Sequence, residues 1–302
     1  MVPVSTVPRL PPRDPLGHKG TFGNVVVIGG HAANPVMLGG PALAARAAFR
    51  SGCGLCTLAM PQPLLASALA VASSATGCPL PVDETGELQP SGVAHVFDPV
   101  VARSHAVVVG PGLGQSFAVQ QIVLRLASTV TVPLVVDADG LNALAATEDF
   151  ARDLTAPTVI TPHAGEFSRL SHRLNLPCDL EKSELWPEAA HRMAQRLGCV
   201  VVLKGAHTVV SDGARVWVNT LEEPALATGG SGDVLAGLVG GLAAQFVGRD
   251  GHGPLDLFHV ACVAVSVHAR SAAQWAQLHG HAGMLALEIA DGIPDAMASM
   301  RA

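Results

Sequence analysis

The sequence predicts an α/β fold of three layers, in which helices cover both faces of a central, mostly parallel sheet. Apolar segments such as 24–28 and 200–203 show no alternation of apolar and polar residues, which is typical of parallel strands buried on both faces. These segments alternate with helical ones along the chain, as in βαβ units. Because 49% of the 302 residues are hydrophobic and only 14% are charged, the chain can bury a large core.

The elements follow one another without a linker or a repeat, which predicts a single domain over residues 1–302. Residues 1–17 are rich in proline and are expected to form an arm laid across the surface. The apolar segments and their glycine and proline boundaries predict the following order: a strand at 24–28, a helix at 42–50, strands at 55–60 and 105–109, a helix near 119–127, strands at 134–136 and 158–161, a helix near 183–197, a strand at 200–203, a hairpin of 208–211 and 215–219, and mostly helix after 229.

Glycine-rich and polar clusters follow the carboxyl ends of successive predicted strands, and we expect them to share one rim, because open parallel sheets bind ligands just beyond these ends. The most informative cluster is Ala-Thr-Gly-Gly-Ser-Gly-Asp-Val-Leu-Ala-Gly at 227–237, where an apolar helix begins. Glycines let backbone N–H groups approach a ligand closely. The unpaired N–H groups at the start of a helix suit phosphate oxygens. We expect Ser231 as the N-cap and Asp233 in the first turn.

Asp233 has two interpretations. A carboxylate beside a phosphoryl-transfer site can take the proton of an attacking hydroxyl, which would make Asp233 a general base. Alternatively, Asp233 only complements the helix dipole, an interaction of roughly 0.3–1 kcal/mol. The glycine-rich motif alone does not separate the two.

Lys204 directly follows an all-apolar predicted strand and begins the motif Lys-Gly-Ala-His-Thr at 204–208. Lysine is a point-charge partner for phosphate. Gly205 would let the chain turn closely around a nucleotide, and Thr208 offers a hydroxyl. The alternative is a lysine that snorkels at the edge of the sheet. We favour the phosphate role.

Two further clusters follow strand ends. Asp137 and Asp139, beside Asn142, could hold Mg²⁺ or orient substrate hydroxyls. The interpretation we favour is that Asp139 caps the next helix and Asp137 bonds loop amides. His163 is a candidate for a polar contact with a ligand. Glu166 could ligate Mg²⁺ through water or simply cap a helix, and the sequence leaves these alternatives open.

Several classes of function are disfavoured. Net charge is −6 without a basic cluster, and tyrosine is absent, which argues against nucleic acid as a partner. No apolar segment is long enough for a membrane helix or a signal peptide, so a cytoplasmic protein is expected. Cys53 and Cys56 form an isolated C-x-x-C pair without a second pair at zinc spacing, so we interpret them as core thiols. Gly-Pro-Gly-Leu-Gly at 110–114 is not a dinucleotide fingerprint.

Six motifs, taken in order, resemble the ADP- or ATP-dependent NAD(P)H-hydrate dehydratases, a family with a ribokinase-like fold. The resemblance covers about 18–294, and six ordered motifs are a far stronger signal than any one of them. The motifs are His-Lys-Gly-Thr-Phe-Gly, Gly-Pro-Gly-Leu-Gly, Asp-Ala-Asp-x-Leu-Asn, Thr-Pro-His-x-Gly-Glu-Phe, Leu-Lys-Gly-Ala-His-Thr and Ala-Thr-Gly-Gly-Ser-Gly-Asp-Val-Leu.

The resemblance implies a repair enzyme, a hydro-lyase that uses a nucleotide to dehydrate the S-epimer of hydrated NADH or NADPH. It further implies ADP, or ATP, as co-substrate, Mg²⁺ as cofactor with protein ligands that we do not assign, and a homo-oligomer of four subunits or more. Many bacterial relatives carry a fused epimerase domain. We expect none here, because the chain has no room for one before His18.

The resemblance also implies roles for individual residues. Asp233 would take the proton of the hydrate's hydroxyl as the phosphoryl group moves onto it. The expected contacts to the adenine nucleotide are Lys204, Gly205, Ala206, His207, Thr208 and Gly232, and the expected contacts to the hydrate are Gly40, Gly112, His163 and Asp233.

Three positions depart from the family pattern. Gly40 stands where alanine is common, and Gly140 replaces the second alanine of Asp-Ala-Asp-Ala. Near the C-terminus, where the family often has His-Gly-x-Ala-Gly-Asp, the chain reads His-Ala-Arg-Ser-Ala-Ala from His268 and lacks the acid, which puts a role of this helix in doubt. Two rival functions stay open: a ribokinase-like small-molecule kinase that acts on thiazole or pyrimidine alcohols, and a non-catalytic nucleotide sensor. The intact Asp233 argues against the sensor.

Overall fold

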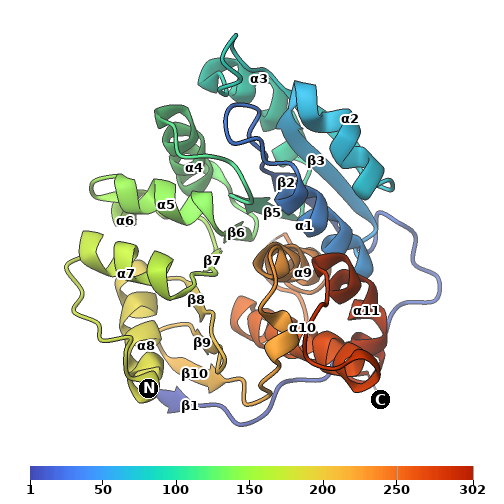
Figure 1. The fold of residues 1–302 in the computed structure, drawn as a ribbon, viewed down its shortest axis with the longest axis vertical. Coiled ribbons are helices and arrows are strands. Elements are labelled where there is room, and N and C mark those ends of the chain that lie inside the picture. The colour runs from blue at the N-terminus through green and yellow to red at the C-terminus, as the bar shows by residue number, and fades with distance from the viewer. Residues whose placement is uncertain (250, 302) are drawn as a thin grey trace.

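Neighbouring residues of the central strands face two different hydrophobic cores. Val25 and Val27 belong to one core, whereas Val26 and Ile28 belong to the other. Every side chain of this segment after Asn24 is therefore buried, and its run of valines shows no alternation. The computed structural model, which describes residues 1–249 and 251–301, thus has the predicted three layers, with helices on both faces of one sheet (Figure 1).

Ten strands of the described part of the chain form one sheet, in the order β1-β10-β9-β8-β7-β6-β5-β2-β3-β4. β9 pairs antiparallel with both β8 and β10, and the other neighbours are parallel. The strands are β1 (Val2–Pro3), β2 (Asn24–Ile28), β3 (Leu55–Pro61), β4 (Thr76–Leu80), β5 (Ala106–Val109), β6 (Leu134–Val136), β7 (Thr158–Ile160), β8 (Val200–Leu203), β9 (Val209–Ser211) and β10 (Arg215–Val218).

The helices divide between the two faces. One core contains buried residues of α1 (Gly39–Arg50), α2 (Gln62–Val71), α9 (Ser231–Phe246), α10 (Leu257–His279) and α11 (Ala286–Ala298). The other core contains buried residues of α3 (Pro90–Val101), α4 (Phe117–Thr129), α5 (Asp139–Ala146), α6 (Phe150–Asp153), α7 (Ala164–Arg173) and α8 (Trp186–Leu197). Two 3₁₀ turns, Ser183–Leu185 and Pro224–Leu226, complete the chain.

The fold class predicted from the sequence is confirmed, and the strands expected at 24–28, 134–136 and 200–203 have those bounds. The sequence-based order omitted α2, β4 and α3, which lie between β3 and β5. Proline obscured two of these elements, because Pro79 lies within β4 and Pro99 within α3. A proline is tolerated in a strand at the edge of a sheet, where its missing N–H breaks no ladder.

The N-terminal arm does more than lie on the surface. Val2–Pro3 add a short parallel strand to β10, and the backbone N–H of Val4 donates to the carbonyl of Val216. Leu10 is buried, and its N–H donates to the carbonyl of Met300. The arm therefore joins both ends of the chain to one edge of the sheet.

Cys53 and Cys56 are buried free thiols, as expected for core residues. Burial raises the pKa of Cys53 to about 12, which keeps this thiol protonated and unreactive. Across residues 1–249 and 251–301, none of the helices combines the length and the hydrophobicity that crossing a membrane requires.

Candidate active site

The loops after β6, β7 and β8 meet at the carboxyl ends of these strands, as the clustering of polar residues predicted. The backbone N–H of Lys204, just after β8, donates to the carbonyl of Pro162 at 2.8 Å. His163 and Lys204 form a parallel bridge. The hydroxyl of Thr161 donates to Asp137 Oδ1 at 2.7 Å, which joins the β7 and β6 loops. Three candidate segments that are distant in sequence thus share one rim.

Lys204 is held between two carboxylates. Its Nζ lies 2.7 Å from Asp137 Oδ1 and 3.9 Å from Glu166 Oε2. Burial disfavours the ammonium, but Asp137 and Glu166 outweigh burial, so the pKa of Lys204 is raised and the side chain stays charged. A snorkelling lysine would extend its ammonium into water, whereas 18% of this side chain is exposed. The snorkelling interpretation is therefore excluded.

The glycine-rich motif begins α9, but its cap differs from the expectation. Gly230, with φ +90°, is the N-cap, and Ser231 is the first helical residue. The prediction of Ser231 as N-cap is wrong, because the backbone at position 230 enters the left-handed region, where glycine is favoured. Asp233 does lie in the first turn of α9, as expected.

Asp233 is a partly buried carboxylate with an altered pKa. Burial is the largest cause and the charge of Asp137 the second, and together they raise the pKa of Asp233 to about 7, against the opposing effect of Lys204. Asp233 also closely approaches α1, since a Cβ atom at Gly40 would lie 2.9 Å from its Oδ1. A carboxyl group with a pKa near neutrality is suited to take up and release a proton.

A cavity of about 500 Å³ opens beside the start of α9. Lys204, Ser231 and Gly232 line its charged end, and Leu226, Leu235 and Val265 line its apolar part. A Cβ atom at Gly232 would lie 3.2 Å from Lys204 Nζ, so the ammonium faces the first turn of the helix. An apolar pocket that ends at a helix N-terminus and a lysine can hold a base and its phosphates.

Four residues of the 204–208 motif line this cavity: Lys204, Gly205, Ala206 and Thr208. His207 does not line it; its exposed ring lies 3.0 Å from Glu222, which does. The hydroxyl of Thr208 donates to the carbonyl of Gly205 at 2.9 Å, so it closes the loop rather than pointing to a ligand. Gly205 packs under the ring of Trp186, which leaves no space for a side chain.

His163 caps α7. Its Nδ1 accepts hydrogen bonds from the N–H groups of Gly165 and Glu166, and Glu166 Oε2 accepts from the N–H of His163. Glu166 therefore does cap a helix, as one of its two interpretations held, because it forms a reciprocal capping box with His163. Glu166 also contacts Lys204, so capping is not its only interaction. The Nε2 of His163 lies 3.3 Å from Glu166 Oε1, and the ring is half exposed.

The interpretation we favoured for the two aspartates is wrong in detail. Asp139 Oδ2 accepts a hydrogen bond from the backbone N–H of Gly114 at 2.9 Å, so Asp139, and not Asp137, bonds a loop amide. The N-cap of α5 is Ala138, with φ 48°. Asp137 bonds the Thr161 hydroxyl and Lys204 instead of loop amides. The spacing of the two acids could not reveal partners that lie on other strands.

Gly112, the remaining substrate candidate, lies in the loop after β5 with φ +56°. A Cβ there would lie 3.1 Å from that of Met37, which packs over the glycine from the loop before α1. Gly40, at the start of α1, faces Asp233 as described above. The four expected substrate contacts thus come from α1, the β5 loop, the N-cap of α7 and α9.

His268 is a site residue that the sequence left in doubt. It lies on α10, lines the cavity, and places Nε2 at 3.0 Å from the carbonyl of Ser231. Because a carbonyl only accepts, His268 donates from Nε2. Burial lowers the pKa of His268 to about 4, so the ring is neutral. The sequence also missed other lining residues, Asn219 and Glu223, because no motif marks them.

The described residues contain no group of three or more His, Cys, Asp and Glu side chains with the geometry of a metal site. Asp137 and Glu166 contact Lys204, which faces the start of α9, and Asp233 lies in the first turn of that helix. The Oδ2 of Asp137 lies 3.9 Å from the position that a Cβ of Gly232 would take.

The fold and the site together define a ribokinase-like protein, with a glycine-rich helix start and an acid at the rim of a mostly parallel sheet. A ribokinase-like superfamily protein of Enterococcus faecalis V583 is 25% identical, covers 99% of this chain and 96% of its own, and superposes with a TM-score of 0.78. The ADP/ATP-dependent NAD(P)H-hydrate dehydratase of Bacillus subtilis, co-crystallised with ATP and Mg²⁺, is 28% identical with a TM-score of 0.74, covering 98% of this chain and 100% of that one.

The chain belongs to the NAD(P)H-hydrate dehydratase family, whose sequence model matches residues 25–295. Similar relatives are the bifunctional NAD(P)H-hydrate repair enzymes of Salinibacter ruber, 37% identical over 94% of this chain, and of Vibrio cholerae, 37% identical over 93%. This chain spans about half the length of those two proteins, covering 50% of each. The family assignment made from six ordered motifs is confirmed.

Proposed function

We propose that this chain is a hydro-lyase that uses an adenine nucleotide to dehydrate the S-epimer of hydrated NADH or NADPH, which restores the working cofactor. Membership of the dehydratase family supports the reaction class. The observation that carries the proposal is the position of Asp233. This acid has a pKa of about 7 and lies in the first turn of α9, and the residue before it, Gly232, faces Lys204.

The nucleotide would occupy the cavity of about 500 Å³. Lys204 would supply charge to its phosphates, and Gly232 would supply its backbone N–H. Gly205, Ala206, His207 and Thr208 would shape the loop around the nucleotide, His207 through its backbone, because this residue does not line the cavity. The proposed contacts to the hydrated ring are Gly40, Gly112, His163 and Asp233.

A hydroxyl on the reduced ring is a poor leaving group, and phosphorylation makes it a good one. Asp233 would take the hydroxyl proton while the oxygen attacks the terminal phosphorus and the bond from that phosphorus to the nucleotide breaks. The ring nitrogen then expels phosphate, and loss of a proton from the neighbouring ring carbon restores the dihydropyridine. The N–H groups at the start of α9 would stabilise charge on the moving phosphoryl group.

Magnesium fits the donor set of this site. Three carboxylates surround a single ammonium, so phosphates need additional positive charge, and Mg²⁺ binds to one or two carboxylates together with phosphates. Asp137 and Glu166 are the residues that would hold the ion. When bound, it would neutralise charge on the nucleotide. We further propose ADP as the nucleotide, a cytoplasmic location and a homo-oligomer; these three assignments rest on the family resemblance.

The test is to incubate hydrated NADH with the protein, Mg²⁺ and either ADP or ATP. Recovery of near-ultraviolet absorbance is expected with one of the two nucleotides. No recovery with either would refute the proposed dehydratase activity. A stable phosphate ester formed from a thiazole or pyrimidine alcohol would instead identify the chain as a small-molecule kinase.

A further inference from the structure

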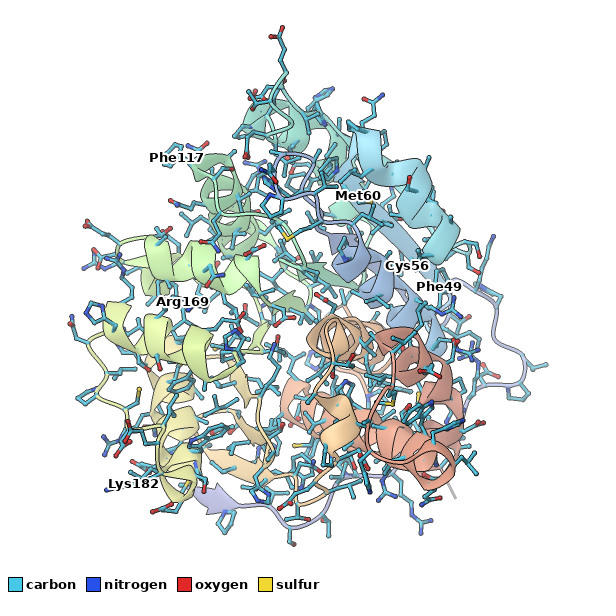
Figure 2. All side chains as sticks on the ribbon, in the orientation of Figure 1. Phe49, Cys56, Met60, Phe117, Arg169 and Lys182 are labelled. Atoms are coloured by element: carbon cyan, nitrogen blue, oxygen red, sulfur yellow. The ribbon has the colours of Figure 1, made fainter. Side chains whose placement is uncertain are left out.

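A second groove, of about 620 Å³, opens between α5 and α7 and shares no lining residue with the nucleotide cavity. Two arginines of α7, Arg169 and Arg173, line it together with His172. Asn142 of α5 and Gln115 of the loop after β5 form the opposite side. Figure 2 shows Arg169 in the space between the two helices.

Both guanidinium groups are fixed across the groove. Arg169 donates from Nε to Asn142 Oδ1 at 2.9 Å, and Arg173 donates from Nε to the carbonyl of Ala145 at 2.7 Å. The two residues are separated by about 6 Å along the helix axis and lie on the same face. Nε is thus the anchor in each, and the two terminal nitrogens of each arginine remain as donors.

Neither Arg169 nor Arg173 forms an ion pair with an acidic side chain of the described residues, although some other arginines do. Arg46, Arg125 and Arg192 each pair with an Asp or Glu side chain. No carboxylate of residues 1–249 and 251–301 lies within 4 Å of a nitrogen of Arg169 or Arg173. An anchored, unneutralised guanidinium pair is suited to an anion with several oxygens, above all phosphate.

Hydrogen bonds of Asp139 link the groove to the loop that carries Gly112. Asp139 accepts hydrogen bonds from Asn142 and Gln115 in the groove and from the N–H of Gly114, next to the Gly112 turn. Its charge is also among the causes that raise the pKa of Asp233. Because three N–H donors surround Asp139, its negative charge is partly compensated before a ligand arrives.

The length of α7 also suits a long substrate. The helix leads from its N-cap, His163, at the active site to Arg173, a rise of about 15 Å. Hydrated NADH and NADPH carry a tail of two sugars and an adenine joined by a diphosphate, with a third phosphate in NADPH. With the ring at Asp233 and the nucleotide cavity taken by the co-substrate, this tail needs another path.

We propose, on the basis of the proposed function, that the α5–α7 groove binds a phosphate on the tail of the hydrated cofactor, with Arg169 and Arg173 as its donors. The phosphate is either the diphosphate that both cofactors contain or the third phosphate that only NADPH contains. In both cases the groove contributes to binding of the substrate and not to the chemical step.

The main test variant is Arg169→Gln, which keeps a donor for Asn142 and removes the charge. We expect its KM for hydrated cofactor to rise about tenfold, with kcat and the KM for ADP unchanged. Arg169→Lys should restore part of the affinity. Arg192→Gln, at an exposed arginine of α8 outside the groove, is the matched control and should leave every constant unchanged.

Hydrated NADPH and hydrated NADH are compared as substrates. If the KM of Arg169→Gln rises only for hydrated NADPH, the groove binds the third phosphate. If the KM rises equally for both substrates, the groove binds the diphosphate. Unchanged KM values for both, or a rise in the KM for ADP instead, would overturn the proposal. Binding of NADPH, followed by the fluorescence of NADPH, is a measurement that needs no turnover. Arg169→Gln should weaken NADPH binding about tenfold even if the dehydratase assay fails. Unchanged NADPH binding would contradict the groove assignment.

Discussion

The carboxylates on the two sides of the site differ in their hydrogen bonding. On the side formed by β6, β7 and β8, Asp137 accepts hydrogen bonds from Thr161 and Lys204, and Glu166 accepts one from the backbone of His163. On the side formed by α9, the carboxylate of Asp233 has no hydrogen-bond partner among residues 1–249 and 251–301, and its pKa is about 7.

The difference separates binding from chemistry. Asp137 and Glu166 contact Lys204 and hold its ammonium in place beside the start of α9. Asp233 is partly buried beside those same charges and has no hydrogen-bond partner among the described residues, so its raised pKa lets it exchange a proton near neutral pH. The first side is therefore expected to control nucleotide binding, and the second to control turnover.

The largest expected effect is that of Asp233→Asn. The variant keeps the shape of the carboxylate but cannot accept a proton, so kcat should fall by a factor of about 10²–10⁴. The affinity for ADP, measured by calorimetry, should change less than about threefold. If turnover and ADP binding fell together, Asp233 would belong with the binding side and the comparison would fail.

Lys204→Ala tests the binding side. Removing the ammonium should weaken ADP binding by about 10- to 100-fold, because a charge-assisted contact to phosphate is lost. Lys182→Ala, at an exposed lysine outside the cavity, serves as control. Because Asp137 and Glu166 lose their partner, thermal unfolding must be measured alongside. A folded Lys204→Ala variant with unchanged ADP affinity contradicts the assignment.

The protonated form of Asp233 links stability to pH. Its pKa is raised from 3.8 to about 7, so the folded state holds a proton that the unfolded state has already released between these values. The contribution of Asp233 to stability is present below about pH 4 and is lost as the pH rises to 7. Asp233→Asn should therefore stabilise the protein at pH 8 by up to about 4 kcal/mol, less what solvent screening removes at this partly exposed carboxylate. The gain should vanish near pH 4, as followed by urea unfolding; a gain independent of pH would exclude this linkage.

The smallest expected effect is on the pH profile. If Asp233 acts as the base, kcat/KM should fall tenfold per pH unit below about 7. Asp137→Asn removes the second largest cause of the raised pKa, so the inflection should move to lower pH by about one unit. Asp98→Asn, at an exposed carboxylate of α3, should leave it in place. An inflection that Asp137→Asn does not move would mean that the two sides are electrostatically independent.

How much of the site the sequence could predict depends on the range of the interactions. The strand ends that carry Asp137, His163 and Lys204 were recognisable, because apolar runs followed by polar residues are local patterns. The edge strand β4 was not, since Pro79 interrupts the pattern that would identify it. The capping box between His163 and Glu166 is also local, and capping was one of the two readings left open for Glu166.

The sequence by itself determined the layered α/β fold, the order of the principal strands, the family and the acid at the start of α9. These features depend on periodicity and on motifs within a few residues. Only the tertiary structure decided which charges are compensated. Lys204 and Asp137 are distant in sequence but lie 2.7 Å apart, and Asp233 is partly buried beside them without a hydrogen-bond partner in the described part of the chain. Acidity depends on burial and on neighbouring charges, and folding fixes both by bringing together the ends of separate strands.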